Sequence, residues 1–140
     1  MEILELNTLS AEQTTDILAL MTELDPSIAV TPAMLEDTVS DPCTHFFAAV
    51  SDGRIVGCAS LCVCCSPTGR KGGVEDVVVS SACRGQGLGR LLLEHIIDYA
   101  RGLSPIVLHL TSRPVRVAAN KLYQSLGFHY YDTNVYKLPL

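Results

Sequence analysis

Residues 77–90 read Val-Val-Val-Ser-Ser-Ala-Cys-Arg-Gly-Gln-Gly-Leu-Gly-Arg, an apolar run that passes into a glycine-rich turn. β-Branched residues favour a strand, and from Leu88 to Arg101 apolar residues recur with the spacing of an amphipathic helix. Glycines let a backbone approach a ligand closely, and a helix N-terminus carries partial positive charge. The stretch therefore predicts a strand, a loop and a helix that together bind an anion such as pyrophosphate, with Arg84 and Arg90 adding charge nearby.

Spacing excludes two common phosphate-binding loops. The dinucleotide fingerprint requires a third glycine where Arg90 stands, and it normally follows the first strand of a chain. A Walker A loop requires Gly-Lys-Ser or Gly-Lys-Thr, whereas this chain has Gly89-Arg90-Leu91 at that place. The loop must therefore belong to another class.

Arg84, Gly87 and Gly89 match the Arg/Gln-x-x-Gly-x-Gly/Ala spacing, and the loop resembles the acetyl-CoA signature of the GNAT superfamily of N-acetyltransferases. The strand 74–79 with its turn locally resembles that of glucosamine-phosphate N-acetyltransferases, and 120–128 resembles the family's closing motif. The resemblance covers about residues 72–138. It implies an α/β (α+β) fold whose mixed, mostly antiparallel central sheet has six to seven strands, about four flanking helices and a splayed central parallel strand pair.

The remaining sequence supplies suitable elements for one N-acetyltransferase domain over residues 1–140, because neither repeats nor linkers interrupt it. Ser10 and Gln13 form a capping-box pattern before the first helix. The unit from Val74 to Leu110 is expected to contain a parallel strand pair with a right-handed crossover. Strands are expected at 3–6, 45–50, 55–65, 74–79, 106–110, 128–131 and 135–138, and helices at 11–24, 32–39, 88–101 and 115–126.

Composition narrows the partners and the compartment. The formal net charge of −5 disfavours nucleic acid and anionic membranes and favours a cationic partner. The chain has no transmembrane-length apolar run and no signal-peptide pattern at its start, so a cytoplasmic location is expected. The six cysteines lack paired CxxC spacing, which predicts no metal site and small, buried thiols in a reducing compartment; the alternative is a reactive or zinc-binding thiol.

The resemblance assigns the coenzyme contacts. In the family, backbone amides of the loop hold the pyrophosphate, and the preceding strand offers its amides to pantetheine and the acetyl carbonyl. A second segment adds Arg116 or Asn120, because Arg116 occupies the place where many relatives have asparagine. The residues expected to bind acetyl-CoA are thus Val77, Val78, Val79, Arg84, Gly85, Gln86, Gly87, Leu88, Gly89, Arg90, Arg116 and Asn120.

Two side chains are candidates for proton transfer. An attacking amine must be neutral, and Glu75 is the candidate base, acting directly or through water; the alternative is a structural pair with Arg or Lys. Asp76 is expected on the opposite face of the strand. Tyr123 matches the family tyrosine that lies near the coenzyme sulfur and is the candidate acid; the alternative is a packed core tyrosine.

The sequence thus predicts an acetyl-CoA-dependent N-acetyltransferase that uses no metal and transfers acetyl to a primary amine of a small molecule, aminosugar-like or other, by direct attack on the thioester. A peptide or protein amine is the alternative acceptor. A non-catalytic acyl-CoA-binding regulatory module is the alternative outside enzymes. A homodimer is plausible because the apolar hairpin and the C-terminal strands could pair between chains.

Overall fold

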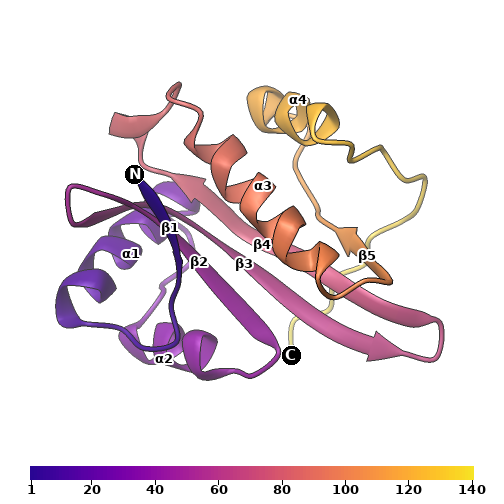
Figure 1. Ribbon diagram of the computed structural model, residues 1–140, viewed down its shortest axis with the longest axis horizontal. Helices are drawn as coiled ribbons and strands as arrows, with labels where there is room; N and C mark the ends of the chain where they lie inside the picture. Colours follow the sequence, from indigo (N-terminus) through magenta and orange to yellow (C-terminus); the bar gives the residue numbers. More distant parts are fainter. The chain divides into compact units, whose positions relative to one another are not determined.

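Residues 1–110 fold around a central five-stranded sheet (Figure 1). The computed structural model describes all residues 1–140 and divides them into two units, Met1–Leu110 and Thr111–Leu140. The first unit contains β1 (Glu2–Glu5), α1 (Ala11–Leu24), α2 (Pro32–Ser40), β2 (Thr44–Ser51), β3 (Arg54–Ser66), β4 (Gly69–Val79), the 3₁₀ turn η1 (Ser81–Cys83), α3 (Leu88–Arg101) and β5 (Ile106–His109); the second contains α4 (Val117–Ser125).

The strands lie in the order β1-β2-β3-β4-β5. The first three pairings are antiparallel, and β4 pairs with β5 in parallel. A parallel pair needs a long crossover connection, which α3 supplies. The mixed, mostly antiparallel sheet and its parallel strand-helix-strand unit are thus confirmed.

Helices cover both faces of this sheet. α1 and α2 pack on one face, where Ile17, Leu20 and Leu35 join Phe46, Cys58 and Val78 in a buried cluster. α3 crosses the other face (Figure 1), and its His95 and Tyr99 contact the ring of Phe47 edge-on. Successive residues of β2 therefore serve opposite halves of the core, as strand alternation requires.

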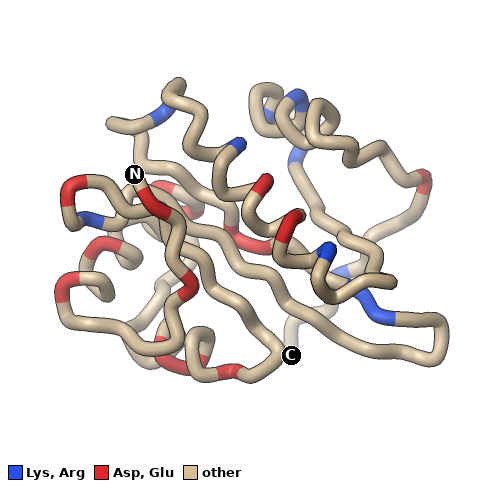
Figure 2. The backbone as a smooth tube through the Cα atoms, in the orientation of Figure 1, with Lys and Arg blue, Asp and Glu red and all other residues tan.

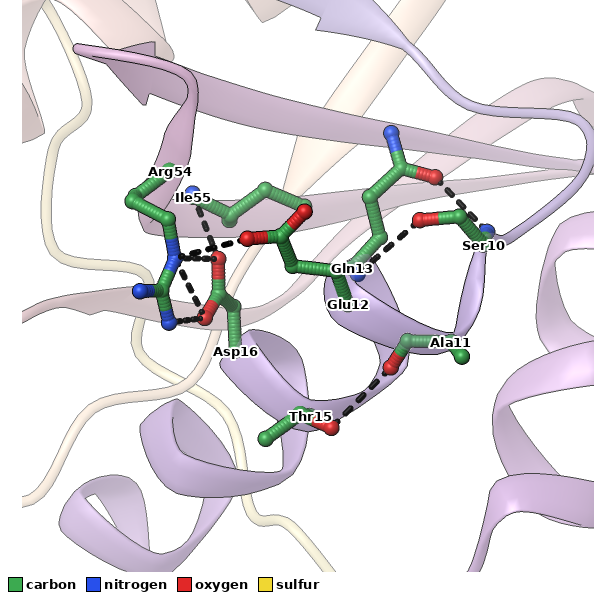
Figure 3. Close-up of polar contacts among 8 residues, drawn as sticks. All are labelled: Ser10, Ala11, Glu12, Gln13, Thr15, Asp16, Arg54 and Ile55. Carbon is green, nitrogen blue, oxygen red and sulfur yellow. Dashed lines mark hydrogen bonds and ion pairs between the residues drawn. The ribbon is translucent and has the colours of Figure 1, made fainter.

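The helix boundaries predicted from capping and turn residues agree with the structure. α1 and α3 have the predicted bounds, and Ser10 and Gln13 form the expected capping box (Figure 3). The buried face of α3 consists of Leu88, Leu92, Leu93, Ile96 and Ala100, whereas Leu91 is exposed. None of the helices has the length and apolarity needed to cross a bilayer.

The predicted strands 128–131 and 135–138 are wrong, so the sheet has five strands rather than six or seven. Residues 128–140 form no ladder with any strand, and apart from the half-buried Phe128 the large apolar side chains among them are exposed: Tyr130, Tyr131, Val135, Tyr136, Leu138 and Leu140. β-Propensity reports that a segment can fit a pleated surface, but a strand also needs a partner backbone.

The expectation that the cysteines fill the core is also largely wrong. Only Cys58 is buried; Cys62 and Cys83 are half-buried, and Cys43, Cys64 and Cys65 are exposed. β3 and β4 extend as a long hairpin beyond the helices that cover the sheet (Figure 1). The end of β3 that contains Cys64 and Cys65 therefore lies outside the core, although its apolar composition predicted burial.

A polar cluster fastens α1 to the turn between β2 and β3 (Figure 3). The Asp16 side chain, 6% exposed, accepts hydrogen bonds from the Ile55 backbone N–H at 3.0 Å and from the Arg54 guanidinium, whose Nε lies 3.0 and 3.1 Å from its two oxygens. Glu12 lies farther from Arg54 Nε, at 3.8 Å. A buried carboxylate requires such partners, so Asp16 fixes the seating of the helix.

Replacing Asp16 should destabilise the fold. We expect Asp16→Ala to lower the free energy of unfolding by about 1–3 kcal/mol, because it leaves the Ile55 N–H without its acceptor. Glu12→Ala removes a charge from the same cluster but only an exposed, distant pair, and should change stability by less than about 0.5 kcal/mol. Urea unfolding at neutral pH measures both, and equal losses would contradict the role given to Asp16.

The contact between Asp16 and Arg54 should also make the stability of the fold depend on pH in the acidic range. Hydrogen bonds from Arg54 lower the pKa of Asp16 below its ordinary 3.8. A lowered folded-state pKa stabilises the fold above the unfolded value, and this contribution is lost as the pH falls through the lower folded value. The wild type should therefore lose more stability than Asp16→Asn between neutral pH and pH values below 3.8.

Candidate active site

One extra residue interrupts the regular pairing of β4 with β3. Ser60 pairs with Glu75, whereas Cys58 pairs with Val78, so β4 gains one residue between these pairs. Asp76 adopts a left-handed conformation there, with φ of 53°. Aspartate tolerates this conformation better than most residues, and a one-residue insertion of this kind is a β-bulge.

The bulge places two successive carboxylates on one face of the sheet. Cys58 belongs to the buried cluster beneath α1 and α2, and its cross-strand partner Val78 shares that face. Ser60 lies on the same side by alternation, so Glu75, opposite Ser60, does too. Asp76 shares the alternation of Val78. The expectation that Asp76 lies on the opposite face from Glu75 is therefore wrong, because it assumed an unbroken strand.

Electrostatic effects fit this arrangement. Burial raises the pKa of Glu75 above its ordinary 4.5 although the residue is exposed overall, and the charge of Asp76 raises it further. Burial also raises the pKa of the Cys62 thiol, and the carboxylates of Glu75, Asp41 and Asp76 add to the effect. No Lys or Arg nitrogen lies within ion-pair distance of Glu75 or Asp76. The structural alternative for Glu75, a pair with Arg or Lys, is thus not observed.

Beyond the bulge, one edge of β4 is open. Ser80 N–H donates to Val56 O of β3 at 2.9 Å. Because neighbouring residues direct their backbone groups to opposite sides, Val77 and Val79 turn theirs away from β3. On that side β5 pairs only with residues 70–73, although β4 continues to Val79. The parallel pairing therefore ends before residues 77–79, the stretch for which the sequence predicted a splay.

The loop after β4 presents backbone amides at the start of α3. Gly85 and Gly87 have φ of 77° and 79°, and no atom beyond the adjacent residues lies within 4 Å of the position that a Cβ would occupy on either. The first helical hydrogen bond runs from Leu91 N–H to Gly87 O, so the amides of Leu88, Gly89 and Arg90 precede the helical ladder. Open space, amides that precede the helical ladder and the helix dipole fit an anionic group such as a pyrophosphate.

Arg84 is held at the base of this loop. Its Nε donates to Val79 O at 3.2 Å, and its terminal nitrogen lies 3.6 Å from a carboxylate oxygen of Glu23 on α1. The same Glu23 oxygen accepts a hydrogen bond from Ser81 N–H at 2.8 Å. Glu23 is not among the residues predicted from the sequence, because no local pattern links a residue of α1 to a turn 58 positions later.

The second unit contains Arg116, Asn120 and Tyr123. Their spacing places them on one side of α4, which begins after Arg116. The Asn120 side chain donates to Arg113 O at 3.0 Å. Tyr123 is half-buried and packs edge-on against Phe128; burial raises the pKa of its phenol, and Arg116 lowers it in part. Tyr123 therefore carries its proton at neutral pH.

The structure thus brings together Glu75, the open edge of β4 and the loop that ends in α3, all within the first unit. The family model described as "Acetyltransferase (GNAT) family" matches residues 10–128. The chain belongs to this family. GNAT enzymes use acetyl-CoA as co-substrate, and the geometry of the loop and strand of this GNAT chain suits such a molecule.

Relatives of this GNAT chain differ in their substrates. It is 36% identical over 101 residues to N-alpha-acetyltransferase RimI of Mycobacterium tuberculosis, which covers 69% of this chain and 60% of that protein. It is 33% identical over 95 residues to glucosamine 6-phosphate N-acetyltransferase 1 of Oryza sativa, with coverage of 61% and 58%. The chain therefore spans about 60% of the length of these relatives.

Solved structures share the fold. The crystal structure of ribosomal-protein-alanine N-acetyltransferase from Brucella melitensis biovar Abortus superposes with a TM-score of 0.79 and 22% identity, covering 100% of both chains. At this identity the likeness shows the common GNAT architecture alone. It agrees with the mixed sheet of this chain and with the order of its elements.

Removing the charge of Asp76 should change the titration of its neighbour. We expect Asp76→Asn to lower the pKa of Glu75 toward 4.5 without reaching it, because burial, the larger cause, remains. Asparagine also tolerates the left-handed backbone. Carbon-detected NMR titration of the Glu75 carboxyl measures the shift. Asp98→Asn on α3 removes an equal charge elsewhere and should leave Glu75 unchanged; the same shift in both variants would refute the local coupling.

Proposed function

We propose that this chain is an acetyl-CoA-dependent N-acetyltransferase that acetylates a primary amine of a small molecule. The observation that carries the proposal is the open edge of β4 leading into the amide-rich loop at the start of α3. Amides of Val77 and Val79 would hold pantetheine and polarise the acetyl carbonyl, and amides of residues 86–90 would hold the pyrophosphate. Acetyl-CoA supplies the activated acetyl group as a thioester.

Glu75 is the proposed base. Its carboxyl has no cationic partner in the protein, and its raised pKa brings its basicity closer to that needed at neutral pH. It would accept a proton from the amine, directly or through a water, as the amine nitrogen bonds to the acetyl carbon and the carbon–sulfur bond breaks. Burial raises the pKa of the Cys58 thiol to about 12 and also raises that of Cys62. These two thiols are therefore poor nucleophiles, which argues against an acyl-cysteine step at either of them.

Tyr123 is the proposed proton donor to the departing thiolate. The raised pKa of its phenol keeps the proton in place until a strong base forms beside it. The side chain of Arg116 opposes part of this rise and would ease proton release. Arg116 and Asn120 stay proposed coenzyme contacts on the same side of α4.

Charge distribution favours a cationic acceptor. Ten of the fifteen Asp and Glu residues precede Arg54, which is the first Lys or Arg of the chain. Seven of these acidic residues lie in β1, α1 and α2, and Figure 2 shows acidic positions along these elements. Glu75 lies on the sheet face that α1 and α2 cover. Such a surface attracts an amine and repels a phosphorylated acceptor. We therefore favour an amine without a phosphate group over an aminosugar phosphate.

A peptide amine is the second candidate acceptor. The relative RimI is described as an N-alpha-acetyltransferase, and it matches a larger share of this chain than the aminosugar enzyme does. An acidic surface would also suit a peptide with basic side chains. A matched set of acceptors separates the two classes.

Coenzyme binding should depend on the left-handed glycine of the loop. We expect isothermal titration calorimetry to detect acetyl-CoA binding by the wild type, and Gly87→Ala to weaken it about tenfold or more, because alanine strains this conformation by about 1–2 kcal/mol and shifts the amides. Gly53, with φ of 76° in the β2–β3 turn, also has open space around it. Gly53→Ala should therefore cost similar stability without affecting binding. Absence of binding by the wild type would refute the proposed function.

Turnover should separate an enzyme from a regulatory module. With a panel of polyamines, amino acids, aminosugars and lysine peptides, we expect thiol release with a cationic acceptor. Glu75→Gln should lower kcat roughly 100-fold and remove the acidic limb of the pH profile with little change in KM for acetyl-CoA. Tyr123→Phe should lower kcat about 10- to 100-fold, whereas Tyr136→Phe, at an exposed position, should not. Coenzyme binding without transfer to any acceptor would favour the regulatory module.

A further inference from the structure

Glu23 joins α1 to the base of the loop that precedes α3. One carboxylate oxygen accepts a hydrogen bond from Ser81 N–H at 2.8 Å and lies 3.6 Å from a terminal nitrogen of Arg84. Arg84 in turn donates from Nε to Val79 O at 3.2 Å. Glu23 therefore contacts both ends of the turn that connects β4 to the glycine loop.

The turn has few other anchors. Ser80 N–H donates to Val56 O of β3, and Cys83 N–H donates back to Ser80 O. No other side chain from outside the segment makes a hydrogen bond or ion pair with residues 80–87, and the left-handed glycines are surrounded by open space. Glu23 is thus the one side chain from another element that fixes where the loop begins.

α1 is a firm support for this contact. Its first half is fastened to the β2–β3 turn through Asp16, and its apolar face, including Ile17, Leu20 and Met21, is buried in the cluster above the sheet. Glu23 lies one residue before the end of this helix. A carboxylate carried on a helix held in two ways loses little further freedom when it binds Ser81.

The charge of Glu23 argues against a simple electrostatic role. A carboxylate beside an anion-binding loop repels the anion, and Arg84 offsets this only in part because it is an exposed partner. The contribution of Glu23 is instead to the geometry of the loop. It holds Ser81 and directs Arg84 toward Val79 O, on the open side of β4.

We propose that Glu23 is a positioning residue for the coenzyme, which acts through Ser81 and Arg84 to hold the phosphate loop and the end of β4 in their binding geometry. The proposal rests on the proposed function, because the loop is taken to bind acetyl-CoA. It also makes α1 a physical link between the acidic N-terminal surface and the coenzyme loop.

Two substitutions at Glu23 distinguish a geometric role of its carboxylate from an electrostatic one. Glu23→Gln removes the charge but keeps an oxygen that can accept from Ser81 N–H; Glu23→Ala removes both. If Glu23 positions the loop, Glu23→Ala should raise the Kd and KM for acetyl-CoA about 5- to 10-fold, the loss expected for one charge-assisted hydrogen bond, with kcat at saturation nearly unchanged. Glu23→Gln should stay within about twofold of the wild type. If charge repulsion dominates instead, both variants would bind acetyl-CoA more tightly, and the proposal is overturned.

A readout without coenzyme separates this proposal from the proposed function. Amide hydrogen exchange at Ser81 should quicken in Glu23→Ala and stay near wild-type protection in Glu23→Gln. Glu36→Ala, which removes an exposed carboxylate from α2, is the matched control and should alter neither exchange nor binding. If the wild type fails to bind acetyl-CoA, the proposed function fails whatever Ser81 does. If the wild type binds but Glu23→Ala binds equally well, the positioning role alone is overturned.

Discussion

The residue that Asp76 adds to β4 lies between the two parts of the candidate site, the carboxylates and the open strand edge. Before the bulge, β4 pairs with β3 on one side and with β5 on the other; after it, the strand keeps only β3. The same insertion brings Glu75 and Asp76 to one face, beneath α1 and α2. A bulge increases local twist and re-aims side chains. The bulge thus places the proposed base on the α1 and α2 face just before the stretch of β4 whose amides are proposed for the coenzyme, a stretch left open because the pairing with β5 ends at Gly73.

α1 makes hydrogen bonds to two segments that are far apart in the sequence, the β2–β3 turn and the segment that follows β4. Near its start, Asp16 binds the β2–β3 turn (Figure 3). At its last turn, Glu23 binds the segment after β4. Apolar burial provides most of the attraction between a helix and a sheet, but it is non-directional. Hydrogen bonds at both ends supply direction, so they fix the rotation of α1 and with it the place of the loop.

Features that depend on neighbouring residues were predictable from the sequence. Ser10 with Gln13 gave the start of α1, and the glycine turn before Leu88 gave the start of α3. Features that depend on distant strands were not. The bulge at Asp76 exists only relative to β3, the exposure of Cys64 depends on how far the β3–β4 hairpin extends beyond the helices, and the strands expected after Gly127 lack a partner. Glu23 could not be predicted for the same reason, since it contacts Ser81 and Arg84 only because the fold brings α1 close to them.

The charges of this chain act at two ranges. At long range, the acidic surface opposes the approach of an anionic coenzyme and favours that of an amine, but salt screens exposed charges beyond about 8 Å under physiological conditions. At short range, the loop would hold an anion through backbone amides, which carry no net charge and do not attract distant anions. Arg84 fits this division, because Glu23 and Val79 O engage its guanidinium and leave the amides as the main anion-binding groups. A largely main-chain anion site therefore lets an acidic protein bind an anionic coenzyme while its surface stays selective for cationic acceptors.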